Sequence, residues 1–217
     1  MKGVRAIGLQ HIYLFDDSFQ NLSPTNALKQ FLYFLKSKGN AGVINFSYSG
    51  DIDSVHFDLT IKENFILDAI PTSLIRDEEN NLNEFLASMK NPYLVELINR
   101  LGPLTESMKD LPTDKLKLAS LVKAFLSPSD FILLVHPDEY LNSKQIELIK
   151  SCIGFEAKEK KRMVFITPKN KDIWLDTATN LISKCEDTHT FLEHENPLIS
   201  SHISKSSEEV LPFKKAS

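Results

Sequence analysis

The distribution of apolar residues is most informative between residues 111 and 142. Apolar positions in residues 115–126 recur at the spacing of one helix face, so this segment is predicted to be an amphipathic helix. Pro112 suits the first turn of such a helix, and Asp114 is interpreted as its N-cap. After a turn, the apolar run at residues 131–135 predicts a strand buried on both faces, which is typical of a parallel sheet.

Similar patterns predict the remaining elements. Short apolar runs predict strands at residues 4–7, 11–15, 43–48 and 163–167, and a last strand that begins at residue 181. Helical spacing predicts helices over most of residues 63–100, over residues 143–153 and over residues 174–181. Another helix is expected to start with Ser23 as N-cap and Pro24 at its first position, and to end at Gly39. Strands that alternate with helices indicate an α/β fold with a mainly parallel sheet.

Composition and charge narrow the class of protein. With 217 residues the chain can form one domain with a full core, and 42% hydrophobic and 25% charged residues are ordinary for a globular protein. A net charge of −4 gives no reason to expect nucleic acid as a partner. Two cysteines are too few for a disulfide framework and suit a reducing cytoplasm. The sequence has no apolar run of about 20 residues and no signal-peptide pattern, so membrane association would come through a partner.

The helix and strand between residues 111 and 142 resemble part of the ABC-type ATPase domain. In that family a helix runs from the LSGGQ signature to the Walker B strand, and the framework positions here keep the family's residue types. These positions are Leu111, Leu121, Ala124, Leu133, Leu134, Pro137 and Leu141. Residues 58–65 also resemble the family's LTVRENV stretch. The resemblance implies a P-loop-NTPase-like fold, a mainly parallel sheet flanked by helices, with an inserted helical subdomain and a truncated N-terminal β part.

The residues that carry the family's chemistry are replaced in this sequence. The place of the signature holds Leu111, Pro112, Thr113, Asp114 and Lys115. At the end of the predicted Walker B strand, Val135 stands in the place of the magnesium-binding aspartate and His136 in the place of the catalytic glutamate. Pro168 replaces the switch histidine. The resemblance therefore implies a scaffold that lacks the hydrolytic residues.

The phosphate-binding loop of the family would fall at residues 16–23. That loop follows the pattern G-x-x-x-x-G-K-[ST], because glycines let backbone N–H groups surround the phosphates and the lysine neutralises them. Here the glycine positions are Asp16 and Asn21, the lysine position is Leu22, and only Ser23 matches. Because no lysine or glycine occurs between residues 16 and 28, a shifted register does not restore the loop. Ser23 is therefore interpreted as a helix cap and not as a magnesium ligand.

The segment after the predicted strand at residues 43–48 corresponds to the family's Q-loop. The glutamine of that loop would fall at Gly50 or Asp51. Thr60 and Glu63 have the spacing of a capping box, which accounts for both residues as a helix start. In the family this turn and the helical insert that follows it contact a membrane permease. The candidate partner-docking residues are Asp51, Asp53 and Asp58.

These observations lead to the expectation of a pseudo-ATPase, a catalytically inactive ABC ATPase-like protein with no nucleotide, cofactor or metal site. It is expected to act as a structural or regulatory subunit, as a homodimer or a heterodimer with an active ABC ATPase, docked on a membrane permease. Its expected location is the cytoplasm, at the inner face of the cytoplasmic membrane. Two alternatives stay open. One is an active or nucleotide-binding ABC ATPase that uses displaced residues such as Asp138 and Glu139, with positive charge from Lys115, Lys117 or Lys123. The other is a free-standing adaptor.

The resemblance also divides the chain into parts. Residues 1–60 and 123–194 are expected to form the α/β core, and residues 61–122 the helical insert with the signature-like helix. From residue 195 the sequence is rich in polar residues, so residues 195–217 are expected to be a flexible tail. The basic run at residues 158–162, KEKKR, is expected to be a solvated helix end or loop.

Overall fold

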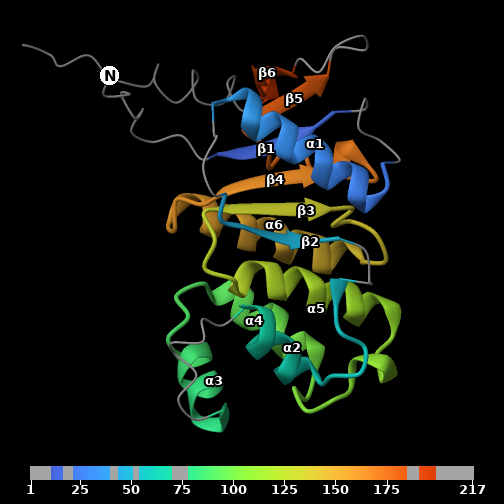
Figure 1. Cartoon of the computed structure of the whole chain (residues 1–217), viewed down its shortest axis with the longest axis vertical. Coiled ribbons are helices and arrows are strands. Elements are labelled where there is room, and N and C mark those ends of the chain that lie inside the picture. The colour runs from blue at the N-terminus through green and yellow to red at the C-terminus, as the bar shows by residue number, and fades with distance from the viewer. Residues whose placement is uncertain are drawn as a thin grey trace, which may run out of the picture.

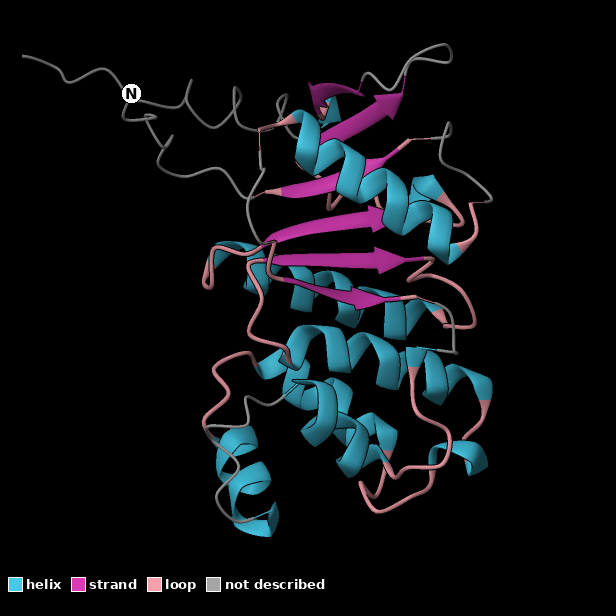
Figure 2. Ribbon diagram, viewed as in Figure 1, coloured by secondary structure: helices cyan, strands magenta, loops and turns pink. Residues whose placement is uncertain are grey.

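The computed structural model describes residues 11–16, 22–39, 44–50, 54–69, 78–184 and 191–198 of the chain. Several expectations lie outside the described residues. They concern the strand at residues 4–7, the truncated N-terminal β part, Asn21, Asp51, Asp53 and the tail beyond residue 198. Figure 2 shows the helices, strands and loops of the described part.

Six strands form one sheet in the order β2-β3-β4-β1-β5-β6 (Figure 1). In chain order they are β1 (Ile12–Phe15), β2 (Phe46–Ser49), β3 (Phe131–Val135), β4 (Met163–Thr167), β5 (Asn180–Lys184) and β6 (Phe191–Glu195). Neighbouring strands are parallel except for β5 and β6, which are antiparallel. The mainly parallel sheet expected from the continuous apolar runs is confirmed, and β3 has the predicted bounds.

Helices cover both faces of the sheet and extend beyond its β2 edge (Figure 1). α1 (Pro24–Ser37) lies on one face, and α6 (Ser143–Lys158) lies on the other. α5 (Thr113–Leu126) packs on β2 and β3 and separates the sheet from a helical part. That part contains α2 (Ile61–Ala69), α3 (Glu78–Ala87) and α4 (Pro92–Leu101); η4 (Met108–Asp110) and η5 (Lys171–Ile173) are single 3-10 turns. The expected insert is present, but α5 continues past residue 122, so the insert and the sheet share this helix.

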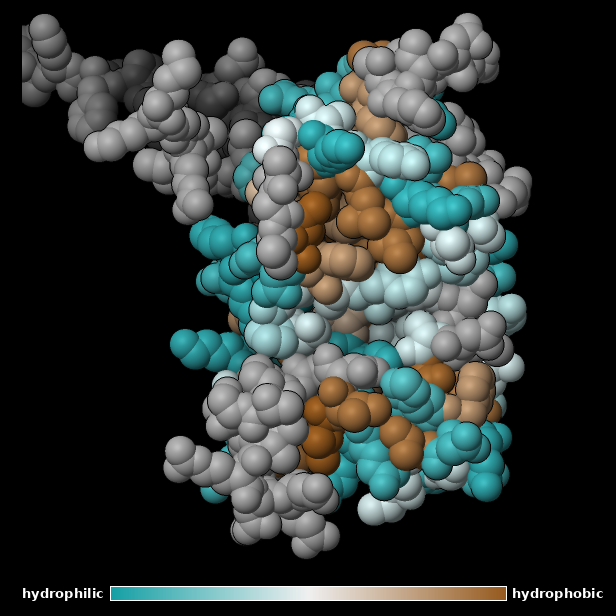
Figure 3. Space-filling model, in the orientation of Figure 1, coloured by the Kyte–Doolittle hydropathy of each residue, from teal (hydrophilic) through white to brown (hydrophobic). Residues whose placement is uncertain are grey.

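Alternation along the strands divides the core into two layers. The layer toward α1 is aromatic: Tyr13 stacks on Phe165 with ring centroids 4.7 Å apart, and Phe34 of α1 packs against both rings. Phe15 is fully buried in the same layer, and Tyr13 is buried beside it. The other layer is mainly aliphatic and joins residues such as Leu14 to α4, α5 and α6. On the face seen in Figure 3, apolar side chains gather over the strands next to α1 and over the helices beyond the β2 edge.

The helix predicted over residues 174–181 is wrong. After η5 the chain makes turns and enters β5 directly. The N–H of Thr179 donates to the carbonyl of Ile12, and this bond draws the chain into the sheet beside β1. The apolar spacing that suggested a helix instead reflects two turn residues, Trp174 and Ala178, that are fully buried in the core.

The polar tail begins later than residue 195, which corrects the expected boundary. Glu195 is the last residue of β6, and Asn196 is only 1% exposed. The backbone N–H of Asn196 donates to the carbonyl of Thr179, and its side-chain Nδ2 donates to the carbonyls of Leu175 and Ala178, both at 2.7 Å. Because these partners are distant in the sequence, the local polar composition gave no sign of them.

Two more local predictions are corrected by the structure. α5 begins at Thr113 with Pro112 at the N-cap position, and no side chain caps it, so the interpretation of Asp114 as the cap is wrong. Asp114 lies in the first turn, where a carboxylate suits the helix dipole. The basic run is not wholly solvated, since Arg162 is buried with its Nη1 3.0 Å from Oε2 of Glu156.

Candidate functional site

Parallel topology brings the carboxyl ends of four strands to one edge of the sheet (Figure 1). Asp16 follows β1, Gly50 follows β2, His136 follows β3 and Pro168 follows β4. The N–H of His136 donates to the carbonyl of Thr167 at 2.7 Å, which continues the pairing of β3 with β4. Ligands of open α/β sheets bind outside this edge. The segments that correspond in position to the phosphate loop, the Q-loop, Walker B and the switch therefore lie along the same edge of the sheet.

A buried lysine from α5 lies at the end of this edge that is formed by β2 and β3. The side chain of Lys117 is fully buried, and its Nζ donates to the carbonyl of Gly50 at 2.7 Å and to the carbonyl of Val135 at 2.8 Å. A buried ammonium group is costly unless oxygen acceptors surround it, so these contacts are part of what keeps it in place. The ammonium thus joins the end of β2 to the end of β3. The sequence offered one signal for this role, a lysine between two apolar residues, Leu116 and Leu118, of the predicted helix.

The same face of α5 holds the segment that follows β2. Ser120, one turn after Lys117, has its Oγ 2.8 Å from Oγ of Ser49 and 2.5 Å from Oγ of Ser54. Lys123, one turn further on, donates from Nζ to the carbonyl of Ser54 at 2.6 Å. Residues three apart lie on one side of a helix, so the three side chains form a continuous row of anchors. Both ends of the Q-loop place are therefore fastened to α5.

The residues at the Walker B place carry no carboxylate. Val135 is fully buried in the aromatic layer that faces α1. His136 is 4% exposed and adopts a left-handed backbone conformation with φ of 48°, which is unusual for a residue other than glycine. Its Nδ1 lies 3.8 Å from Oε2 of Glu139. The strand therefore ends in an apolar side chain followed by a buried imidazole in a tight turn.

Asp138 and Glu139 hold the loop that follows β4. The two carboxylate oxygens of Asp138 accept the backbone N–H groups of Lys169 and Asn170, at 3.0 and 2.8 Å. Oε1 of Glu139 is 3.7 Å from Nζ of Lys169. Pro168, the residue at the switch place, is buried immediately before these two acceptor contacts. Both acidic residues thus bind protein groups of the adjacent loop.

The phosphate-loop place is partly described. The N–H of Asp16 donates to the carbonyl of Ile182 at 2.9 Å, which ties the end of β1 to β5. Leu22 packs against the aromatic layer of the core. Ser23 caps α1, because its Oγ accepts the N–H of Asn26 at 3.4 Å and Pro24 begins the helix. The interpretation of Ser23 as an N-cap is confirmed.

The signature place forms the start of α5. Leu111 is buried in the core, while Pro112 and Thr113 are exposed and Asp114 and Lys115 are partly exposed. Lys117 reaches the strand ends from the next residues of the same helix, so this segment lies on the same side of the molecule as those ends.

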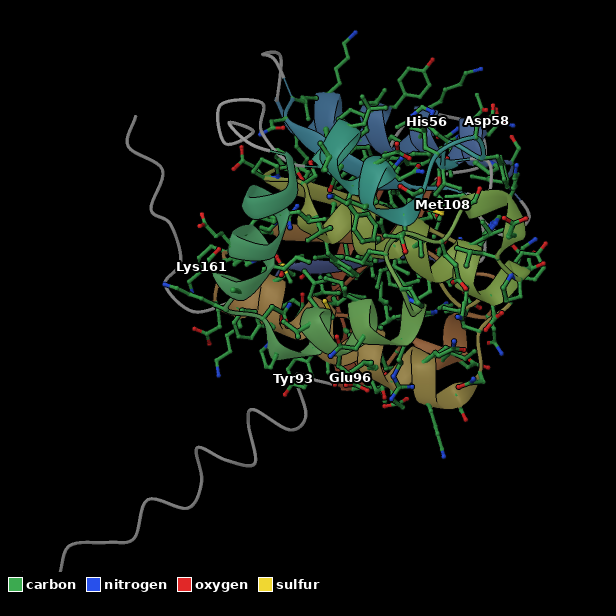
Figure 4. The ribbon with its side chains drawn as sticks, turned by 90° about the horizontal axis from the view of Figure 1, so that it is seen from below. His56, Asp58, Tyr93, Glu96, Met108 and Lys161 are labelled. Atoms are coloured by element: carbon green, nitrogen blue, oxygen red, sulfur yellow. The ribbon has the colours of Figure 1, made fainter. Side chains whose placement is uncertain are left out.

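The described part of the docking region is a rigid turn. Oδ1 of Asn64 accepts the N–H of His56 at 2.7 Å, and its Nδ2 donates to the carbonyl of His56 at 2.9 Å. This fully buried amide holds a turn in which Phe57 and Asp58 are exposed. Figure 4 shows His56 and Asp58 next to each other, far from Glu96 of α4. Of the three candidate docking residues, only Asp58 is described.

The start of α2 confirms the predicted capping box. The N–H of Glu63 donates to Oγ1 of Thr60 at 3.2 Å, and the N–H of Thr60 donates to Oε2 of Glu63 at 2.7 Å. The carboxylate of Glu63 accepts hydrogen bonds from the backbone N–H of Thr60 and from its Oγ1 hydroxyl, and these two bonds, the backbone one first, lower the pKa of Glu63 below its ordinary value. Both side chains are therefore used within the helix start.

Three cavities lie elsewhere in the described structure. One of about 530 Å³ lies between α3, α5 and α6; one of about 330 Å³ lies beside β2; and one of about 470 Å³ lies beside the start of α6. None of these three is lined by Asp16, Leu22, Ser23, His136 or Pro168. Within the described ranges, no group of three or more His, Cys, Asp or Glu residues is placed to hold a metal ion. Among the same residues, no helix has the length and apolarity that a membrane span requires.

Comparison with known proteins identifies the fold. No protein-family model matches the chain, and no curated protein sequence matches it. An ATP-binding subunit of an ABC transporter superposes with a TM-score of 0.64 at 12% identity, over 90% of this chain and 82% of the other. An inward-facing putative metal-chelate type ABC transporter gives a TM-score of 0.54 at 14% identity, over 88% of this chain and 74% of that one. A ribosome-bound archaeal structure with Pelota and ABCE1 gives 0.58 at 15% identity, over 91% of this chain.

The extent of these matches differs among the relatives. The chain spans 32% of the matched chain in the ribosome-bound structure, so it corresponds to about a third of that protein. At identities of 12–15% the likeness establishes the fold alone. The chain therefore has the P-loop-NTPase-like fold of ABC ATPase nucleotide-binding domains, as its sequence predicts.

Proposed function

We propose that this chain is a catalytically inactive ABC-ATPase-like protein, a structural or regulatory subunit that docks on a membrane permease at the cytoplasmic face. In this proposal it pairs with a second copy or with an active ABC ATPase. The observation that carries the proposal is the fully buried ammonium of Lys117, which donates to the carbonyls of Gly50 and Val135. These carbonyls lie at the sheet edge where this fold places its ligands.

The charges at this edge support the loss of hydrolysis. Phosphoryl transfer in P-loop proteins depends on a carboxylate that helps hold magnesium, on a positioned base and on a cationic phosphate loop. Here the strand end carries Val135 and the buried His136, and Leu22 packs into the core. Because each of these replacements removes a different requirement of phosphoryl transfer, their effects on hydrolysis multiply.

The contacts of Asp138 and Glu139 argue against an active enzyme with displaced residues. Both carboxylate oxygens of Asp138 already accept backbone N–H groups. The two oxygens of Glu139 lie within 4 Å of Nδ1 of His136 and Nζ of Lys169. A magnesium site would have to take Asp138 away from the loop that it holds. We therefore place these residues in support of the loop after β4.

The turn at residues 56–58 supports the docking half of the proposal. Phe57 is 36% exposed beside Asp58, and the buried amide of Asn64 holds the backbone of His56, the residue that precedes them. A rigid, exposed aromatic residue next to a carboxylate suits a partner segment that offers an apolar pocket and a basic side chain. A free-standing adaptor could use the same turn, and only the location of the protein separates that alternative.

Nucleotide binding is the first test. Magnesium ATP is titrated into the full chain up to millimolar concentration, and heat and melting temperature are recorded. We expect no saturable heat and no shift of the melting temperature. A dissociation constant in the low micromolar range would contradict the proposed inactivity.

Docking is tested with charge reversals. Asp58→Lys is expected to lower the membrane-bound fraction in native extracts several-fold without changing the melting temperature. Glu96→Lys is the matched control, because Glu96 is an exposed carboxylate on the far side of the helical part (Figure 4). If Asp58→Lys stays bound as the wild type does, or if the wild type is monomeric and entirely free of membranes, the docking proposal is wrong.

A further inference from the structure

A groove of about 530 Å³ lies at the amino edge of the sheet, on the side away from the strand carboxyl ends. Its apolar lining consists of Phe85, Met89, Leu94, Phe125, Leu126 and Phe155. Leu94 of α4 and Phe125 and Leu126 of α5 form a buried floor. Phe85, Met89 and Phe155 keep part of their surface exposed. The volume falls within the roughly 300–1,000 Å³ typical of small-molecule sites. The groove therefore has the size and the apolar surface of a ligand site.

A buried carboxylate fixes the polar rim of this groove. Oε1 of Glu156 contacts Nδ2 of Asn91 and Nζ of Lys160, both at 2.9 Å, while Oε2 contacts Nη1 of Arg162 at 3.0 Å. Arg162 already balances the charge of Glu156, so Lys160 brings surplus positive charge to the rim. Lys90 directly precedes Asn91 and lines the same groove. The rim is thus positioned by a rigid buried network.

The segment at the end of α6 is positively charged, whereas the chain as a whole is negatively charged. The chain has a net charge of −4, yet residues 158–162 contain four basic residues and one acidic residue. That acid, Glu159, lines the groove and lies 4.0 Å from Lys158. Lys161 has a φ of 57°, at a helix end where glycine is the usual residue. Figure 4 shows it projecting from the side of the molecule opposite His56 and Asp58.

We propose that this groove binds a small amphiphilic carboxylate, with its apolar body on Phe85, Met89 and Phe155 and its carboxylate at Lys90 and Lys160. An apolar body would cover the exposed part of the aromatic and thioether side chains, which water now contacts. A carboxylate would pair with the surplus charge through charge-assisted hydrogen bonds. A cationic amphiphile lacks the second interaction, and a short anion lacks the first. This inference is independent of the proposed function and does not rest on it.

The test uses sodium dodecanoate below its micelle concentration, titrated into the full chain by calorimetry. Dodecyltrimethylammonium, which has the same tail with the opposite charge, and acetate, which has the charge without the tail, serve as comparison probes. We expect one saturable site for dodecanoate, binding of the cationic probe weaker by about tenfold or more, and no binding of acetate. Uptake of dodecanoate that does not saturate, or equal binding of the cationic probe, would overturn the proposal.

Variants then locate the site. Lys90→Ala is expected to weaken dodecanoate binding about tenfold, the loss of one charge-assisted contact. Met89→Asp, which places a carboxylate in the apolar lining, should abolish binding. Lys144→Ala is the matched control, because Lys144 is exposed in the first turn of the same helix α6, at the end away from the groove. Unchanged affinity in Lys90→Ala and Met89→Asp, or an equal loss in Lys144→Ala, would refute the assignment.

Discussion

Each edge of the parallel sheet contains a buried cation, and the two cations have different partners. At the carboxyl edge, the ammonium of Lys117 donates to the main-chain carbonyls of Gly50 and Val135. At the amino edge, the guanidinium of Arg162 pairs with Glu156 and also donates to the carbonyls of Phe125, Ser127 and Ser129. Burial lowers the pKa of Arg162, and the nearby Glu156 opposes that shift.

The difference follows from the shapes of the two groups and indicates what each edge does. Guanidinium offers five N–H donors in a planar fork, so one Arg162 can join the end of α5, the start of β3 and α6. Ammonium is a compact charge with three donors, and Lys117 fills a small space between two strand ends. The amino edge is therefore a structural clamp beside an open groove. At the carboxyl edge, an internal contact joins the ends of β2 and β3.

The largest expected effect comes from breaking the clamp at the amino edge. Arg162→Met leaves the carboxylate of Glu156 buried with one remaining cation, and removal of one partner of a buried pair costs about 3–5 kcal/mol of unfolding free energy. Urea unfolding measures the loss. The double variant Arg162→Met with Glu156→Gln should recover part of it. A loss below about 1 kcal/mol would show that the clamp is dispensable.

The carboxyl edge should show a smaller loss. Lys117→Met removes the ammonium and its two hydrogen bonds to main-chain carbonyls, at a net cost of about 0.5–1.5 kcal/mol for each bond, or about 1–3 kcal/mol in total. Lys123→Met serves as the comparison, because Lys123 is on the same helix face and donates to the carbonyl of Ser54. Its unfolding free energy should also fall, because the carbonyl of Ser54 loses this donor. Equal unfolding free energies for Lys117→Met and the wild type would remove the main support for the proposed function.

The dependence of stability on alkaline pH tests the burial of Tyr13, which lies in β1 between the two edges of the sheet. Burial, and then the charge of Glu193, raises the pKa of Tyr13 to about 12 from an ordinary value of 10.0. The folded form thus holds its phenol proton where the unfolded chain has lost it, so stability is present below pH 10 and declines as pH rises toward 12. The decline from this group should be about 1 kcal/mol after allowance for solvent screening.

Tyr13→Phe isolates that contribution. The ring stack with Phe165 is kept while the titrating hydroxyl is removed, so the variant should lose stability less steeply above pH 10 than the wild type. Burial also raises the pKa of Cys152, and that contribution is common to both proteins. Parallel curves for the two proteins would mean that Tyr13 does not titrate as its surroundings indicate.

The smallest expected effect is on catalysis. His136→Glu supplies an acidic base, and Leu22→Lys supplies a cation, but neither rebuilds the phosphate loop or removes Lys117. Because catalysis of phosphoryl transfer is mostly positioning and electrostatics, steady-state phosphate release should stay at background in both variants. Clear turnover by either one would show that the carboxyl edge retains a working site.

The sequence alone determined the parts of this protein that depend on local pattern. Continuous apolar runs indicated β3 and the parallel sheet, and the Ser23–Pro24 pair indicated the start of α1. The spacing of Thr60 and Glu63 indicated the start of α2. Period, caps and turns are set by residues a few positions apart, so one segment at a time suffices to recognise them.

Only the tertiary structure decided how distant segments satisfy each other's polar groups. The roles of Lys117 and Arg162 depend on carbonyls that are 18 to 67 and 33 to 37 residues away in the chain. The turn after η5 likewise depends on Asn196, which composition had assigned to a tail. A lysine in an apolar helix face signals that a buried acceptor exists, but its identity is fixed by which loops the fold brings to that face. The sequence therefore specified the scaffold, and the fold specified what occupies the ligand edge.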